Sequence, residues 1–137
     1  MGFENFGLVT FTSESKTSDF LTYLEQGKVM TTRCKNCGDY YFPPKMDCPS
    51  CPDSEAEWVE IPEGGKLLTY TVVHYGPSGF EDDAPYTLGI AEFGGALRMF
   101  GRLSKDIPEG EVKPGMALKV VPAKFSQDRI GYEFVKA

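Results

Sequence analysis

Cys34-Lys-Asn-Cys37 and Cys48-Pro-Ser-Cys51 decide the fold of this chain, because they hold all four cysteines of its 137 residues. Each Cys-x2-Cys turn directs two thiolates at one point. Two such turns about ten residues apart suit a tetrahedral four-sulfur metal site at the base of a short hairpin. Gly38 follows the first pair and supplies the unusual backbone dihedrals that such a turn needs. The spacing predicts a structural zinc ribbon.

Two other uses of the cysteines stay open. A rubredoxin-like iron site has similar turns, because tetrahedral sulfur sites suit either metal. Disulfides or a redox-active pair are the third alternative. No basic-then-apolar signal stretch opens the sequence, so we expect no oxidising compartment. Four thiolates leave no coordination position for water or substrate, and we therefore expect the metal to stabilise the fold rather than to catalyse a reaction.

Length and composition predict one compact domain, or a small domain with an accessory module. The hydrophobic content of 41% and the charged content of 25% are ordinary for globular proteins. No apolar run approaches the about 20 residues that span a bilayer, so we expect no membrane partner and a cytoplasmic location. The net charge of −6 argues against a nucleic-acid partner, because such proteins normally collect Lys and Arg.

Residues 1–32 are expected to form an arm and a short helix. Ser18 is a suitable N-cap, and Gly27 lies where a glycine would end the helix. The apolar side of this helix consists of Phe20, Leu21, Tyr23 and Leu24. A helix of about two turns must pack on something, either on the ribbon or barrel of its own chain or on another protein. Residues 7–11 before it are predicted as a short strand or an extended arm.

Residues 33–62 are expected to form the ribbon. Tyr40, Tyr41 and Phe42 are predicted to cover the metal and to serve as the core of so small a module. Apolar and polar residues alternate from Trp58 to Ile61, which predicts a strand that leads toward the next domain.

Residues 63–137 are predicted to form five strands, which makes the fold class mainly β. They are rich in β-branched and aromatic residues and span residues 66–73, 86–93, 96–103, 116–121 and 130–135. Gly94-Gly95 between the second and third strands indicates a tight hairpin. Glycines within strands, at Gly89, Gly101 and Gly131, suggest the bends and bulges of a small closed barrel. Five short strands of this kind predict an OB-type barrel.

Little on this chain could catalyse a reaction by itself. All four thiols are assigned to the metal, and the hydroxyl groups lie in no nucleophile motif. His74, the only histidine, ends the first barrel strand, and a histidine without a partner is more often a polar rim residue than a catalyst. No glycine-rich phosphate loop opens a helix. We therefore expect no catalytic residue here.

The loop from Tyr75 to Tyr86 is the most suggestive element outside the cysteines. It carries aromatic residues at both ends and at Phe80, and three consecutive acids. Loops of this kind border the ligand face of such barrels, although a solvated connector would have similar residues. Arg98 and Arg102 are four apart in a strand and point to one face. They suit a phosphate or a partner's carboxylate, or they are surface charges.

Several stretches together carry a family resemblance: Leu24-Glu-Gln-Gly-Lys28, Arg33-Cys34, Cys37-Gly38, Phe42-Pro-Pro-Lys45, Cys48-Pro49, Cys51, Trp58 and Ala84-Pro-Tyr-Thr-Leu-Gly-Ile-Ala-Glu-Phe93. In this order they resemble the acyl-CoA-associated zinc-ribbon/OB-fold family, long labelled a domain of unknown function. The resemblance covers nearly the whole chain. One departure is Pro52, where the second knuckle of that family usually continues with Gly.

The resemblance implies an accessory subunit of a thiolase-fold enzyme, such as one of the benzoylsuccinyl-CoA thiolase type. In that family the larger chain supplies the acyl-transferring Cys and the oxyanion machinery. The ribbon/OB chain supports the complex and helps to hold the CoA carrier of the substrate. The implied cofactors are structural Zn²⁺ and a CoA thioester shared with the partner. Because CoA offers an adenine and phosphates, we expect it at Tyr75, Phe80, Tyr86, Arg98 and Arg102.

Two rival functions remain open. OB barrels and zinc ribbons both serve in nucleic-acid-binding modules, although a working groove needs clustered basic residues with interleaved aromatic residues. A rubredoxin-like electron carrier would need iron in the four-cysteine site.

Overall fold

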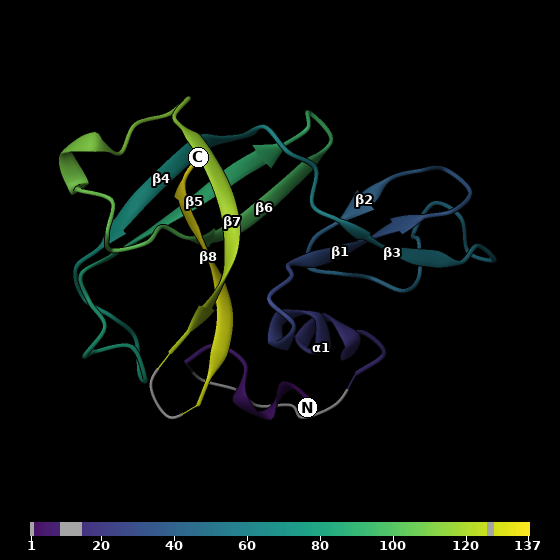
Figure 1. The fold of residues 1–137 in the computed structure, drawn as a ribbon, viewed down its shortest axis with the longest axis horizontal. Helices are drawn as coiled ribbons and strands as arrows, with labels where there is room; N and C mark the ends of the chain where they lie inside the picture. The colour runs from purple at the N-terminus through teal and green to yellow at the C-terminus, as the bar shows by residue number, and fades with distance from the viewer. Residues whose placement is uncertain (1, 9–14, 126–127) are drawn as a thin grey trace.

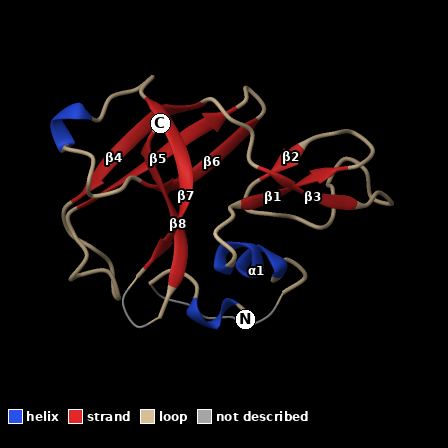
Figure 2. Cartoon of the chain, in the orientation of Figure 1, coloured by secondary structure: helices blue, strands red, loops and turns tan. Residues whose placement is uncertain are grey.

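The computed structural model describes residues 2–8, 15–125 and 128–137, and it confirms a mainly β fold with a ribbon and a five-stranded barrel (Figures 1 and 2). The described elements, in chain order, are η1 (Phe3–Asn5), α1 (Asp19–Glu25), β1 (Met30–Cys34), β2 (Tyr40–Tyr41), β3 (Ala56–Glu60), β4 (Gly65–Val73), β5 (Tyr86–Phe93), β6 (Leu97–Arg102), η2 (Glu109–Glu111), β7 (Ala117–Lys124) and β8 (Ile130–Lys136). The strand or arm predicted at residues 7–11 falls mostly on residues 9–14, which lie outside the described ranges.

The ribbon is an antiparallel sheet with the strand order β2-β1-β3. β1 pairs with β3 from Met30 opposite Glu60 to Cys34 opposite Ala56. β2 pairs with the end of β1 through Arg33 and Tyr40. The strand predicted around Trp58 therefore belongs to this sheet. The division of the chain at 32/33 and 62/63 stays a prediction.

The barrel has the strand order β6-β5-β4-β7-β8, and the two outer strands approach each other. A parallel bridge joins Leu103 to Phe134, and the Ser104 N–H donates to the Phe134 carbonyl at 2.8 Å. This contact nearly closes the barrel. At the β5–β6 hairpin, Gly94 and Gly95 have φ of 62° and 69°, and the N–H of residue 96 donates to the carbonyl of residue 93 at 3.1 Å. The predicted tight turn is confirmed.

Close packing, rather than a bulge, explains two of the strand glycines. The irregularity in the described sheet lies in β4, between Leu67 and Thr69, whereas Gly89 and Gly101 face each other in regular register. A Cβ at Gly89 would lie 2.8 Å from a Leu67 methyl carbon, and one at Gly101 would lie 2.9 Å from the Tyr132 ring. The bulge prediction was therefore wrong at these two positions, because the barrel interior leaves no space there for a side chain.

Helix α1 packs between the ribbon and the barrel of its own chain, below β1 in Figure 1. Its buried residues are Phe20, Leu21 and Leu24, and they pack against Phe42 and Trp58 of the ribbon and Ile130 and Tyr132 of the barrel. The ring centroids of Phe42 and Tyr132 lie 5.2 Å apart, edge to face. Of the two alternatives for the helix, packing on its own chain is the one observed.

The cap of α1 differs from the prediction at its N-terminus. Ser18 has helical backbone angles and makes no capping bond. The helical turn starts earlier: the Ser15 hydroxyl accepts from the Thr17 N–H at 3.1 Å, and the Ser18 hydroxyl accepts from the Ser15 N–H at 3.0 Å. Ser18 thus serves as the far member of a reciprocal cap. At the other end Gly27 has φ of 83°, and the N–H of Lys28 donates to the carbonyl of residue 23, as expected for a C-terminal glycine.

Candidate metal centre and ligand face

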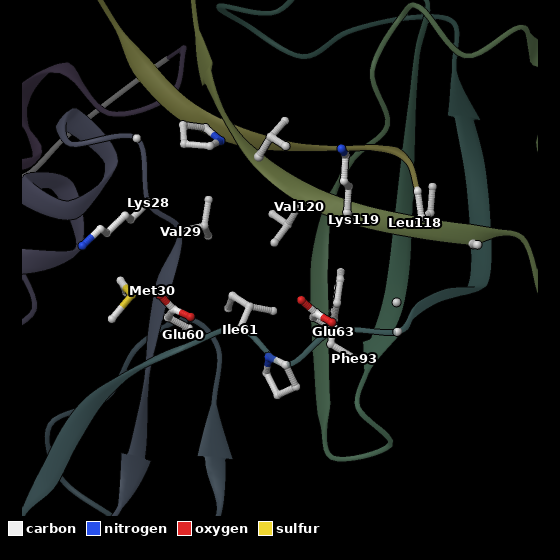
Figure 3. Close-up of a pocket in the computed structure, with 18 residues that line it drawn as sticks. Lys28, Val29, Met30, Glu60, Ile61, Glu63, Phe93, Leu118, Lys119 and Val120 are labelled. Atoms are coloured by element: carbon white, nitrogen blue, oxygen red, sulfur yellow. The ribbon is translucent and has the colours of Figure 1, made fainter.

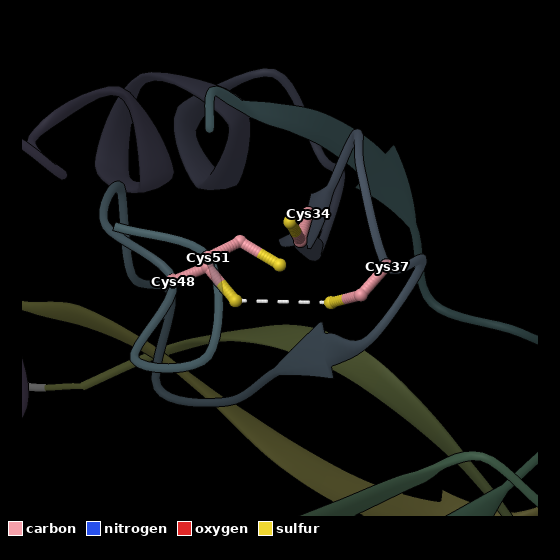
Figure 4. Close-up of side chains that lie close together, drawn as sticks. All are labelled: Cys34, Cys37, Cys48 and Cys51. Carbon is pink, nitrogen blue, oxygen red and sulfur yellow. Dashed lines mark hydrogen bonds between the residues drawn. The ribbon is translucent and has the colours of Figure 1, made fainter. Parts of the chain in front are cut away.

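The four cysteines converge at the end of the ribbon (Figure 4). Their sulfur atoms all lie within 4.8 Å of one another, and the Cys37 and Cys48 sulfurs are 3.7 Å apart. Tetrahedral zinc with Zn–S bonds of about 2.3 Å requires sulfurs about 3.8 Å apart. Cys34 and Cys48 are buried, while Cys37 is exposed. The geometry fits a four-thiolate metal ion.

Backbone hydrogen bonds shape both cysteine turns. The Gly38 N–H donates to the Cys34 carbonyl at 2.9 Å, and Gly38 has φ of 77°, so the predicted need for glycine holds there. In the second turn the Cys51 N–H donates to the Cys48 carbonyl at 3.3 Å. The Ser54 N–H then donates to the Cys51 carbonyl at 3.0 Å. Ser54 therefore closes this turn even though a proline follows the cysteine.

Polar side chains contact three of the four sulfurs, and of these residues the sequence interpretation named only Tyr41, as a cover for the metal. The Ser54 hydroxyl lies 3.1 Å from the Cys34 sulfur and lowers the pKa of Cys34 to about 6. The Tyr41 hydroxyl, 2.9 Å from the Cys48 sulfur, lowers the pKa of Cys48. The Asn36 amide donates to the Cys51 sulfur at 3.2 Å. Such outer contacts orient ligands and stabilise thiolates.

The fourth thiol, Cys37, shows why four sulfurs this close together need a cation. The backbone N–H of Asp39 lowers the pKa of Cys37, but desolvation and the three neighbouring sulfurs outweigh it and raise that pKa to about 12. Four thiolates this close together repel one another. A divalent cation removes that repulsion and deprotonates a coordinating thiol. The four sulfurs therefore fit a metal ion, and binding that ion is the reason for their close approach.

The three ribbon aromatic residues divide between two surfaces. Tyr41 lies at the metal site, as predicted, and contacts the Cys48 sulfur through its hydroxyl, but Tyr40 and Phe42 pack against the barrel core. The prediction that all three cover the metal was wrong for these two. Tyr40 and Tyr41 are consecutive in β2, and consecutive strand residues point to opposite faces. Phe42 packs against both the barrel core and the buried residues of α1.

The structure brings three of the five proposed CoA residues together. The rings of Phe80 and Tyr86 lie 6.2 Å apart. Arg102 lies over the Tyr86 ring at 5.6 Å, and both its terminal nitrogens donate to Asp83. Burial raises the pKa of Asp83, but the Arg102 guanidinium outweighs it and the net pKa is lowered. This ion pair holds the loop before β5 against the end of β6.

The other two proposed CoA residues, Tyr75 and Arg98, lie apart from this cluster. Tyr75 is 94% exposed at the start of the loop. Arg98 lies at the opposite end of β6 from Arg102, is mostly exposed, and donates from Nε to Glu92 at 3.3 Å. It lines a cleft of about 410 Å³ between β2 and the β5–β6 hairpin, together with Lys45. Arg98 and Arg102 do share the outward face of β6, as their spacing predicts.

A second groove, of about 600 Å³, runs between the ribbon and β7 (Figure 3). Val29, Ile61 and Val120 project into it, and Lys28 and Lys119 lie along it. No sequence signal pointed to this groove, because it forms only when the two sheets pack together.

Comparison with known proteins fits this two-part architecture. Residues 22–57 match a family model described as the rubredoxin-like zinc ribbon domain of ChsH2, and residues 58–122 match the ChsH2 C-terminal OB-fold domain. A DUF35 domain-containing scaffold protein of Methanocaldococcus jannaschii is 38% identical over 109 residues, which cover 74% of this chain and 77% of that protein. The chain belongs to the ChsH2/DUF35 family.

One further relative and one solved structure are also similar to this chain. The benzoylsuccinyl-CoA thiolase subunit BbsA of Thauera aromatica is 37% identical over 71 residues, which cover 52% of this chain and 48% of that subunit. A solved structure of an Ltp2-ChsH2(DUF35) aldolase superposes with a TM-score of 0.75 over 93% of this chain and 98% of that chain, at 21% identity, which shows a shared fold. In the part of the chain that the structure describes, no helix has the length and apolarity to cross a membrane.

Proposed function

We propose that this ChsH2/DUF35 chain is a non-catalytic, accessory subunit of a thiolase-fold enzyme that acts on an acyl-CoA substrate. The convergence of all four cysteines on one site is the observation that carries the proposal. Acyl transfer through a thioester needs a free thiolate, and here every thiol is committed to the metal. The catalytic cysteine must then lie on another chain. One relative is named as a subunit of benzoylsuccinyl-CoA thiolase, which supports a place in a complex of this kind.

The metal in this proposal is a structural Zn²⁺ held by Cys34, Cys37, Cys48 and Cys51. It would neutralise the four thiolates and fix the tip of the ribbon. The aromatic junction around α1 supports the same role, because it joins the ribbon to the barrel through buried contacts. The two modules then present one rigid surface to a partner.

CoA contact is the finer part of the proposal. Arg102 is engaged by Asp83 and lies between the rings of Tyr86 and Phe125, so it serves the loop rather than a phosphate. Arg98 is better suited to a phosphate, because it is mostly exposed and Lys45 lines the same cleft. Tyr75 and Phe80 remain the proposed aromatic contacts for the adenine.

Reconstitution tests the main proposal. The chain alone is expected to show no CoA-dependent thiolysis, and the thiolase-fold chain is expected to reach full activity only with this chain present. The measurement is the rate of CoA-dependent thiolysis by each chain alone and by the mixture of the two. Thiolysis by this chain alone would refute the non-catalytic role.

Substitution at Arg98 tests the CoA contact. In the reconstituted enzyme Arg98→Gln is expected to raise the KM for CoA by about tenfold or more, because a charge-assisted hydrogen bond contributes about 1.5–3 kcal/mol, and to leave kcat unchanged. Lys113→Gln, an exposed lysine in the loop before β7, is the matched control. An unchanged KM in Arg98→Gln would move the phosphate contact elsewhere.

A further inference from the structure

One edge of β4 is open for most of its length. β4 pairs with β5 up to Val73, but on its other side it pairs with β7 only at Gly65 and Lys66. The last backbone bonds on that side are those of Leu67, with the residues that precede β7. β7 runs in the opposite direction, away from residues 68–73, and the segment before Gly115 makes no backbone hydrogen bond to them. Among the described residues, 68–73 have backbone partners on β5 alone.

The open edge has the composition of a strand that pairs. Leu68-Thr-Tyr-Thr-Val-Val73 contains no charge, no proline and no glycine, and four of its six residues are exposed, with Leu68 and Tyr70 each at 39%. An exposed, uncharged, β-branched edge is a template for another strand, and folded proteins normally protect such edges.

Two other edges among the described strands, on β7 and β3, do carry that protection. The Ala117 carbonyl accepts a hydrogen bond from the N–H of Ala137 and therefore faces β8. The backbone polar groups of successive strand residues point to opposite sides. The backbone nitrogen of Pro122 therefore lies on the side of β7 away from β8. A proline there offers no N–H to an added strand. On β3, the outer strand of the ribbon, Glu57 and Glu60 place charges along the strand. Of these three edges, on β7, β3 and β4, the β4 edge is the one without a proline or a charge.

We propose that residues 68–73 accept an extended segment of the partner subunit as an added strand. The inference rests on the proposed function, because the partner is the thiolase-fold chain. The incoming segment would be apolar or β-branched where it meets Leu68 and Tyr70. It would carry Lys or Arg where it passes the loop after β4, since Glu81 and Asp82 are exposed there and attract a basic residue.

Two lysine substitutions separate the edge from the neighbouring sheet face. Thr71→Lys places a charge on the open edge, and Phe100→Lys places the same charge on the outward face of β6, where Phe100 is 58% exposed. Binding of each variant to the purified thiolase-fold chain is measured by titration calorimetry. Thr71→Lys is expected to weaken binding by at least about tenfold, as for a central interface residue, and Phe100→Lys to bind as the unmodified chain does. The reverse order would overturn the edge proposal while leaving the accessory role intact.

Hydrogen exchange on the unmodified chain gives a test that needs no variant. Strand addition is expected to slow exchange at alternate amides of residues 68–73 when the thiolase-fold chain binds, since every second N–H faces the open edge. Unchanged exchange there would overturn the proposal even if the two chains bind. A free chain that dimerises, and that becomes monomeric on Thr71→Lys, would assign the edge to a second copy instead. Failure of the two chains to bind at all would remove the proposed function as well.

Discussion

At the scale of single residues, the metal centre is built from more than its four ligands. Ser54, Asn36 and Tyr41 each contact a sulfur, and such contacts tune thiolate stability. The ligands themselves could be predicted from spacing alone. Their supporting residues could not, because polar residues near a cysteine turn are common and only the folded turn shows which of them face inward.

Removal of one ligand should unfold the ribbon. Cys34→Ser or Cys48→Ser is expected to reduce bound zinc from one ion per chain to a small fraction, because structural zinc binding contributes about 10–16 kcal/mol that folding depends on. Metal analysis and thermal melting provide the measurement. Ser50→Ala, an exposed change inside the second pair, is expected to keep both the metal and the melting temperature. Unchanged zinc content and melting temperature in the cysteine variants would contradict the ribbon assignment. Bound iron with thiolate charge-transfer colour in the unmodified chain would show that the site holds iron instead of zinc.

The Asp83–Arg102 pair predicts a pH dependence of stability. The net lowering of the Asp83 pKa in the folded protein means that the pair stabilises the fold above the unfolded pKa of about 3.9, and that this contribution is lost as pH falls below it. Asp83→Asn is expected to cost about 1.5–3 kcal/mol at pH 7. Its free energy of unfolding should also fall less than that of the unmodified chain between pH 5 and pH 2, as measured by urea titration. A parallel acid loss in both proteins, with Glu109→Gln as the exposed control, would show that Asp83 is not responsible.

At the scale of elements, the strands of the barrel could be predicted to within a few residues. Both ends of β5 match, because Pro85 and Gly94 bound it. β7 runs past Val121, where the prediction ended, because Pro122 lies on the side that needs no N–H. The bulge at Leu68 and the contacts of α1 could not be predicted, since both arise only when the sheets pack together.

The helix should contribute more to stability than its length suggests. Leu21 is 0% exposed between ribbon and barrel, so Leu21→Ala is expected to lower the free energy of unfolding by about 2–5 kcal/mol through lost burial and a cavity. Chemical denaturation measures this. Thr22→Ala, on the exposed side of the same helix, is expected to change it by less than about 0.5 kcal/mol. Equal effects of the two substitutions would show that α1 does not hold the two modules together.

At the scale of the whole molecule, charge placement separates the candidate functions. The two arginines on the outer face of β6 are each matched by an acid, Arg98 by Glu92 and Arg102 by Asp83. With a net charge of −6, this argues against a broad basic groove for a phosphate backbone on that face of the described barrel. We expect no tight binding to single-stranded DNA at physiological salt in fluorescence anisotropy. Tight binding that weakens steeply with added salt would favour the nucleic-acid alternative.

Native purification tests the central claim most directly. The tagged chain, expressed in its own cells and purified without crosslinking, is expected to bring down a thiolase-fold protein in a fixed ratio, and native mass spectrometry should show a heteromer that contains both chains and zinc. Purification of this chain alone, or with a stoichiometric partner of a different fold, would contradict the proposal that it is the accessory subunit of a thiolase-fold enzyme.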